Sequence, residues 1–208
     1  MSEGSRKKRI LILAEGYEEK PYIDKMLSFP NINRDAYEFL ETINVKGNGQ
    51  IVPRYQFEIQ RDSADIVLVF CDADKGSEQF WQIVSDIGNN FFSRPEDGIH
   101  VFIFANPVTL QIVLSHFGEV SLTKVSKKKN AEIVEKLTGV SNYDASQEQI
   151  AGIINQIHFR SLDDFKARLS KLSTDPECVP STNFLEFLCR FEGEDTSWIQ
   201  EINDLRKC

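Results

Sequence analysis

The sequence lacks any hydrophobic run long enough to cross a membrane. Its longest apolar segments hold five or six residues, whereas a membrane-spanning helix needs about 20. The basic residues 6–9 precede an apolar run at 10–14, but this run is too short for a signal peptide and Glu15 closes it. We therefore expect a cytoplasmic protein without a membrane segment.

Cysteine and histidine are too few and too scattered to predict a zinc site. The four cysteines include no pair separated by two residues, and His100, His116 and His158 form no short-range metal pattern. The chain also has no Gly-x-x-x-x-Gly-Lys-Ser/Thr loop, which excludes an ATPase of that class. Its net charge of −8 argues against broad electrostatic wrapping of nucleic acid. A nucleic-acid enzyme is still compatible with this charge, because bound cations would offset an acidic site.

The first half of the chain alternates between short apolar runs and helix-like segments. Strands are expected at residues 9–15, 42–46, 66–71 and 100–105. Helices are expected at residues 18–28, 50–62, 78–88 and 107–116, with Gly88 as a C-cap and Asn106 as an N-cap. Strands separated by helices predict crossover connections and a mostly parallel sheet.

The remainder of the chain predicts helices only. They are expected at residues 131–137, 147–157, 162–172, 184–191 and 198–205. We therefore expect an α/β core in residues 1–118 and a helical C-terminal extension, residues 119–208, packed on it.

Acidic motifs follow two of the expected strands. Glu15 ends the first strand and Glu19 comes four residues later, while Asp72 and Asp74 follow the strand at residues 66–71. Because ligand sites of open α/β sheets lie at the carboxyl ends of the strands, we expect these four carboxylates to converge. We expect Glu18, next to them, to be a solvated residue of the first helical turn.

A cluster of carboxylates suits a hard, oxygen-ligated cation, so the four acidic residues are the candidate ligands of Mg²⁺ or Mn²⁺. Glu15 and Asp72 are the candidate catalytic residues, because metal-assisted phosphoryl transfer needs carboxylates that hold an ion and orient water. Acidic residues after a strand also serve as helix caps and turn residues, which is the plain structural alternative.

This combination of motifs resembles the TOPRIM domain of topoisomerases, primases and OLD-family nucleases. The TOPRIM glutamate followed by glycine corresponds to Glu15 and Gly16, and its Asp-x-Asp corresponds to Asp72 and Asp74. Glu19 corresponds to a further acidic position of OLD-like members. The resemblance implies a TOPRIM-like sheet and a nuclease or another phosphoryl-transfer activity on nucleic acid.

RloB-like proteins, which are linked to restriction and phage defence, show a closer similarity over roughly residues 9–137. Their motif Ser-Asn-Pro-x-Phe-Glu-x-Trp is similar to residues 105–112, which places Asn106 at the candidate site. Here Thr109-Leu110 stand in place of the family's Phe-Glu, and Ile112 in place of its tryptophan. A chain without that glutamate is expected to cleave slowly or not at all.

The lysine-rich stretch of the family is similar to Lys127, Lys128 and Lys129, which are candidate contacts to a nucleic-acid backbone. An exposed loop is the alternative for them. The analogy with defence loci also predicts an ATPase partner.

Two further classes of function compete with a nuclease. One is a non-catalytic binding or regulatory module on the same fold. The other is a nucleotide-sugar glycosyltransferase whose Asp-x-Asp holds a metal, although this leaves Glu15 and Glu19 unexplained. A phosphoacceptor receiver domain is a weaker alternative, because it needs an acidic pair after the first strand and a lone aspartate after the third.

Overall fold

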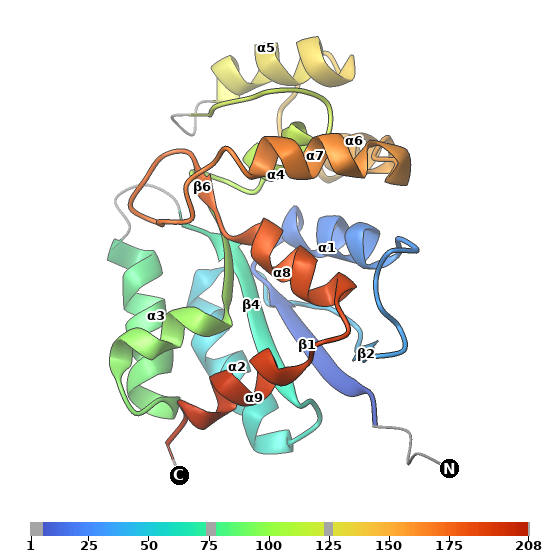
Figure 1. Ribbon diagram of the computed structural model, residues 1–208. Coiled ribbons are helices and arrows are strands. Elements are labelled where there is room, and N and C mark those ends of the chain that lie inside the picture. The colour runs from blue at the N-terminus through green and yellow to red at the C-terminus, as the bar shows by residue number, and fades with distance from the viewer. Residues whose placement is uncertain (1–5, 74–77, 123–126, 208) are drawn as a thin grey trace.

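The computed structural model describes residues 6–73, 78–122 and 127–207 (Figure 1). Among these residues, six strands form one sheet in the order β2-β1-β4-β5-β6, with β3 also paired to β1. The strands are β1 (Lys8–Ala14), β2 (Tyr37–Phe39), β3 (Ile43–Asn44), β4 (Ile66–Asp72), β5 (Phe102–Asn106) and β6 (Ser181–Thr182). All pairings are parallel except that of β5 with β6. The expected α/β fold with a mostly parallel sheet is confirmed.

Helices cover both faces of the sheet. The α-helices are α1 (Glu19–Leu27), α2 (Ile51–Arg61), α3 (Glu78–Phe91), α4 (Leu110–Ser115), α5 (Lys127–Thr138), α6 (Gln147–Asn155), α7 (Leu162–Leu169), α8 (Phe184–Glu192) and α9 (Ser197–Asp204). Three short 3-10 helices are η1 (Asn48–Gln50), η2 (Pro95–Val101) and η3 (Phe159–Ser161). In Figure 1, α8 crosses the front of the sheet, α2 lies behind it, and α4 to α7 stack beyond the carboxyl ends of the strands.

The two central strands owe their position to uninterrupted apolar sequence. Nearly all side chains of β1 and β4 are buried, as expected for parallel strands covered on both faces. The register pairs Ile10 with Ile66 and Ala14 with Phe70. Glu15, which follows Ala14, and Asp72, the last residue of β4, therefore lie at the same edge of the sheet.

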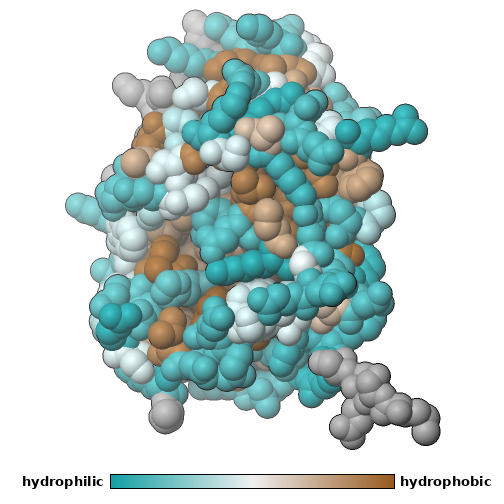
Figure 2. Space-filling view, viewed as in Figure 1, coloured by the Kyte–Doolittle hydropathy of each residue, from teal (hydrophilic) through white to brown (hydrophobic). Residues whose placement is uncertain are grey.

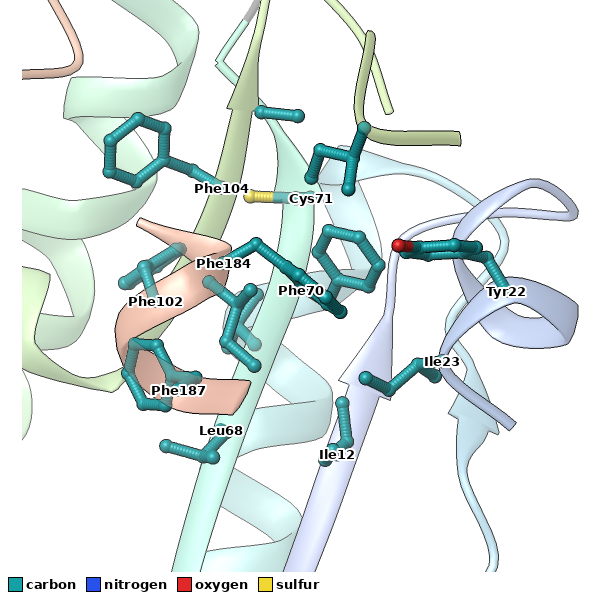
Figure 3. Packing of buried hydrophobic residues seen from close by; sticks show 14 of the residues in the cluster. Ile12, Tyr22, Ile23, Leu68, Phe70, Cys71, Phe102, Phe104, Phe184 and Phe187 are labelled. Atoms are coloured by element: carbon teal, nitrogen blue, oxygen red, sulfur yellow. The ribbon is translucent and has the colours of Figure 1, made fainter. Parts of the chain in front are cut away.

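The C-terminal part of the chain supplies core as well as helices. Phe184 of α8 packs against Phe70 of β4 and Tyr22 of α1, with ring centroids 5.9 Å and 5.4 Å away, respectively (Figure 3). Residues 181–182 also extend the sheet as β6, so this region is not purely helical. The division of the chain at residue 118 stays a prediction.

The face of the molecule shown in Figure 2 is mainly hydrophilic, with apolar side chains gathered in small separate patches. Scattered apolar surface of this kind is ordinary. No helix within the described residues is long and apolar enough to cross a membrane.

Two expected helix boundaries are wrong. Gly88 does not end a helix, because α3 continues to Phe91. A glycine is needed at position 88 because α3 packs closely against Pro95, and a Cβ there would lie 1.8 Å from the Pro95 carbonyl oxygen. The helix expected from Pro107 begins only at Leu110, because Asn106 still belongs to β5 and its side-chain amide donates to the Pro176 carbonyl at 2.8 Å instead of capping a helix.

Candidate metal and catalytic site

Glu15 and Asp72 meet where two adjacent strands end. Glu15 directly follows β1 and Asp72 is the last residue of β4. The backbone N–H of Asp72 donates to Oε2 of Glu15 at 3.1 Å. Asn48 faces the same carboxylate, and we assign its amide with the nitrogen toward Glu15, the orientation in which it donates to both carboxylate oxygens at 3.1 Å. The parallel pairing of β1 with β4 thus brings together the two candidate catalytic residues.

Thr109 holds the Asp72 carboxylate in place. Its backbone N–H and its hydroxyl both donate to Oδ1 of Asp72, at 2.6 Å and 2.8 Å. Thr109 is fully buried and directly precedes α4. Burial raises the pKa of the nearby Glu19 carboxyl group, and the Thr109 side chain is among the polar groups that partly offset this rise. Thr109 therefore lies beside the acidic residues that follow β1 and end β4.

Glu19 is the first residue of α1 and is only 4% exposed. Its carboxylate folds back toward Gly16, whose backbone hydrogen bond to it lowers the pKa. A Cβ at position 16 would stand 3.1 Å from Oε2 of Glu19, so a side chain there would crowd the carboxylate. Gly16 is thus explained by close approach at the site.

Burial raises the pKa of the site carboxyl groups. The pKa of Asp72 is raised well above its usual value, first by burial and then by the charges of Glu19, Glu18 and Glu15. Burial likewise raises the pKa of Glu19. Like charges in a poorly solvated site disfavour ionisation. A bound cation would remove this cost by neutralising the cluster.

Glu18 is not the solvated residue that the sequence predicted. It is half-buried, and its Oε1 is buried with no hydrogen-bond partner among the described residues. Burial, followed by repulsion from Glu19, raises its pKa to about 8. Burial, followed by the negative charge of Glu18, raises the pKa of Tyr143, which lies between α5 and α6. Glu18 therefore acts on a residue more than a hundred positions away in sequence, which a local pattern cannot reveal.

The donor set at this edge is all oxygen and fits a hard cation such as Mg²⁺ or Mn²⁺. Glu15, Glu19 and Asp72 interact with one another, and the buried Oε1 of Glu18 has no hydrogen-bond partner among the described residues. Asp74 lies outside the described residues. Within the part of the chain that is described, no three side chains of ligating type are arranged closely enough to hold an ion. The four-ligand metal site stays a prediction.

The remaining candidate residues are placed differently. Asn106 ends β5, next to β4, but its amide is engaged by Pro176. Lys127 begins α5 and Lys129 is exposed, whereas the side chains of Lys127 and Lys128 lie outside the described set. Nothing therefore tests whether these lysines contact nucleic acid.

Sequence reasoning missed Thr109 and Asn48, in addition to the burial of Glu18. Both are uncharged residues in connecting segments, and only the pairing of strands brings them to the carboxylates. The one available signal for Thr109 was its place three residues after Asn106, within the motif similar to RloB-like proteins.

No protein-family model, no curated protein and no solved structure matches this chain.

Proposed function

We propose that this chain is a metal-dependent nuclease with a TOPRIM-like core, similar in its site to RloB-like and OLD-family proteins. The observation that carries the proposal is the contact between Glu15 and Asp72 at the ends of adjacent parallel strands, 3.1 Å from carboxylate oxygen to backbone nitrogen. The raised pKa values of Glu18, Glu19 and Asp72 support it, because they indicate a site that favours a counter-cation.

In the proposed enzyme, Glu15, Glu19 and Asp72 would hold the cation, with Asp74 as a further candidate. Mg²⁺ or Mn²⁺ would supply an activated water and charge stabilisation for the leaving oxygen of a phosphodiester. Glu15 would orient the attacking water. Thr109 and Asn48 would keep the two central carboxylates in place, since both donate hydrogen bonds to them. The backbone N–H groups at the start of α1 would favour the phosphate.

Cleavage of nucleic acid by the purified chain tests this function. Plasmid DNA, single-stranded DNA and RNA are incubated with Mg²⁺ or Mn²⁺, with wild type compared with Glu15→Gln. We expect nicking that the Glu15 variant loses by about a hundredfold or more, the usual scale for removal of a well-placed charged group. Glu201→Gln, on the exposed face of α9, is the matched control and should cleave as wild type does. Absence of cleavage in both metals, or equal rates for wild type and Glu15→Gln, would contradict the proposal.

A non-catalytic binding module on the same fold is the second candidate. Leu110 favours it, because this residue stands in place of the family's motif glutamate and its side chain is buried in the core. Titration calorimetry combined with the cleavage assay separates the two functions, because both bind Mg²⁺ and only the nuclease cleaves. A module of this kind would bind Mg²⁺ through Glu15 and Asp72 without cleaving any of the three substrates.

A further inference from the structure

A groove of about 590 Å³ lies between β3 and α2. Its charged lining consists of Lys20, Arg54 and Arg61 together with Glu41 and Glu58. One end of this groove adjoins the candidate site, because Asn44 pairs with Ala14, the residue before Glu15. The segment after Asn44 stays beside the site, since the Gly47 N–H donates to the Glu15 carbonyl at 2.8 Å. A chain-like ligand in the groove would therefore lead directly to the carboxylates.

An aromatic side chain on α2 is exposed beside this groove. Phe57 is 48% exposed and so offers one face of its ring to a ligand. It lies between two arginines of the same helix face, with the guanidinium carbons of Arg54 and Arg61 at 5.2 Å and 5.4 Å from its ring centroid. An aromatic ring interleaved with arginines is the arrangement that binds single-stranded nucleic acid, in which bases stack and phosphates meet cations.

The two arginines retain positive charge in excess of their internal partner. Both pair with Glu58, which is buried, at 2.6 Å for Arg54 and 3.8 Å for Arg61. One carboxylate thus faces two guanidinium groups. The Nε of Arg54 is buried without a hydrogen-bond partner among the described residues. The longer contact and the 56% exposure of Arg61 leave it the more available of the two for an external anion.

We propose that the groove between β3 and α2 binds a single-stranded nucleic acid and guides it to the carboxylate site, with one base stacked on Phe57 and a phosphate held by Arg61. This proposal rests on the proposed nuclease function and names the form of its substrate. A base that stacks on Phe57 takes the place of one guanidinium group, and the displaced Arg61 turns to the neighbouring phosphate. A paired duplex cannot offer an unstacked base to the ring, so the surface selects single strands.

The test is a binding measurement without metal, so that cleavage does not contribute. Fluorescence anisotropy of short labelled oligothymidylate and oligouridylate is measured with the full chain in EDTA, beside a duplex of the same length. We expect the single strands to bind more tightly than the duplex. Phe57→Ala should weaken binding about 5- to 150-fold, the range for loss of one stacking side chain. Arg61→Gln should also weaken binding and should reduce its dependence on salt.

Phe159→Ala is the matched control, because Phe159 is 42% exposed on η3 and does not line this groove. It should bind as wild type does, and circular dichroism should show all three variants folded. The groove proposal is overturned if wild type binds no single strand, if it prefers the duplex, or if Phe57→Ala binds as tightly as wild type.

Cleavage in Mg²⁺, measured separately, distinguishes this proposal from the nuclease function. Binding that depends on Phe57 without any cleavage supports the groove and contradicts the nuclease. Cleavage that is unaffected by Phe57→Ala supports the nuclease and overturns the groove.

Discussion

His116 should make this protein sensitive to mild acid. Its side chain is 5% exposed, and its ring is stacked on Phe165 with centroids 3.6 Å apart. Nε2 lies 3.0 Å from the Tyr22 hydroxyl, while Nδ1 is buried with no partner among the described residues. Burial, followed by the charge of Arg168, lowers the pKa of His116 to about 3. The folded protein thus holds this imidazole neutral.

The sign of the pH effect follows from where the protons bind. Between pH 6.5 and about 3 the unfolded chain protonates His116 and the folded chain does not. Because the unfolded state then binds more protons, the free energy of unfolding falls as pH falls through this window. A pH of 4 lies 2.5 units below the usual histidine pKa of 6.5. The free energy of unfolding at pH 4 is therefore lowered by roughly 3 kcal/mol through this one residue. This is a large share of the 5–15 kcal/mol that stabilises a typical domain.

The loss of unfolding free energy caused by His116 is measured by urea unfolding from pH 7 to pH 4, with wild type compared with His116→Gln. Glutamine can still hydrogen-bond Tyr22 but cannot titrate, so the wild-type curve should fall more steeply toward acid by roughly 3 kcal/mol. His158→Gln, at an exposed position, is the control and should follow wild type. The comparison between variants matters because the carboxyl groups of the site act in the opposite direction. Parallel curves for wild type and His116→Gln would refute the reasoning.

Four other substitutions give distinct outcomes. Asp72→Asn keeps the oxygen that accepts hydrogen bonds from Thr109 and removes the charge repulsion with the neighbouring glutamates. It should weaken Mg²⁺ binding in calorimetry, while the melting temperature of the metal-free protein stays the same or rises. A large fall in that melting temperature would favour a purely structural role for Asp72. Glu18→Gln should raise the free energy of unfolding at pH 9 but not at pH 4. The reason is that burial raises the pKa of Glu18 to about 8, so the wild type loses stability as pH rises from 4.5 through 8. An equal effect of the substitution at both pH values would disagree with the raised pKa. Gly88→Ala should destabilise by about 1–3 kcal/mol through its clash with Pro95, whereas Gly152→Ala, with open space around it, should stabilise by about 0.5–1 kcal/mol. Similar melting curves for these two alanine variants would argue against the close packing at Gly88.

The strands that carry the candidate site could be predicted because their information is local. Residues 66–71 form an unbroken apolar run, and the structure places β4 over Ile66–Asp72 with Asp72 at its end. The shared edge of Glu15 and Asp72 then follows from the parallel pairing, which two strands joined by a long crossover adopt. The expected helix at residues 50–62 likewise matches α2, Ile51–Arg61.

Features that depend on distant contacts could not be predicted. β2 and β6 have only three and two residues, so neither carries a period-2 pattern, and each exists because a neighbouring strand offers hydrogen bonds. The need for glycine at position 88 comes from η2, which crosses α3 there. The raised pKa of Glu18 depends on its burial in the folded protein. The local sequence, which predicts a solvated side chain in the first helical turn, does not contain this information.

The late position of α8 in the sequence has a consequence for biosynthesis. A ribosome releases β1, β4 and β5 long before Phe184 can cover Phe70, and β5 lacks its outer neighbour until residues 181–182 emerge. During that interval the nascent chain presents an uncovered apolar sheet face and an open strand edge, both of which promote aggregation. Its yield in cells should therefore depend on chaperones that hold the chain until residue 192, where α8 ends, has emerged from the ribosome.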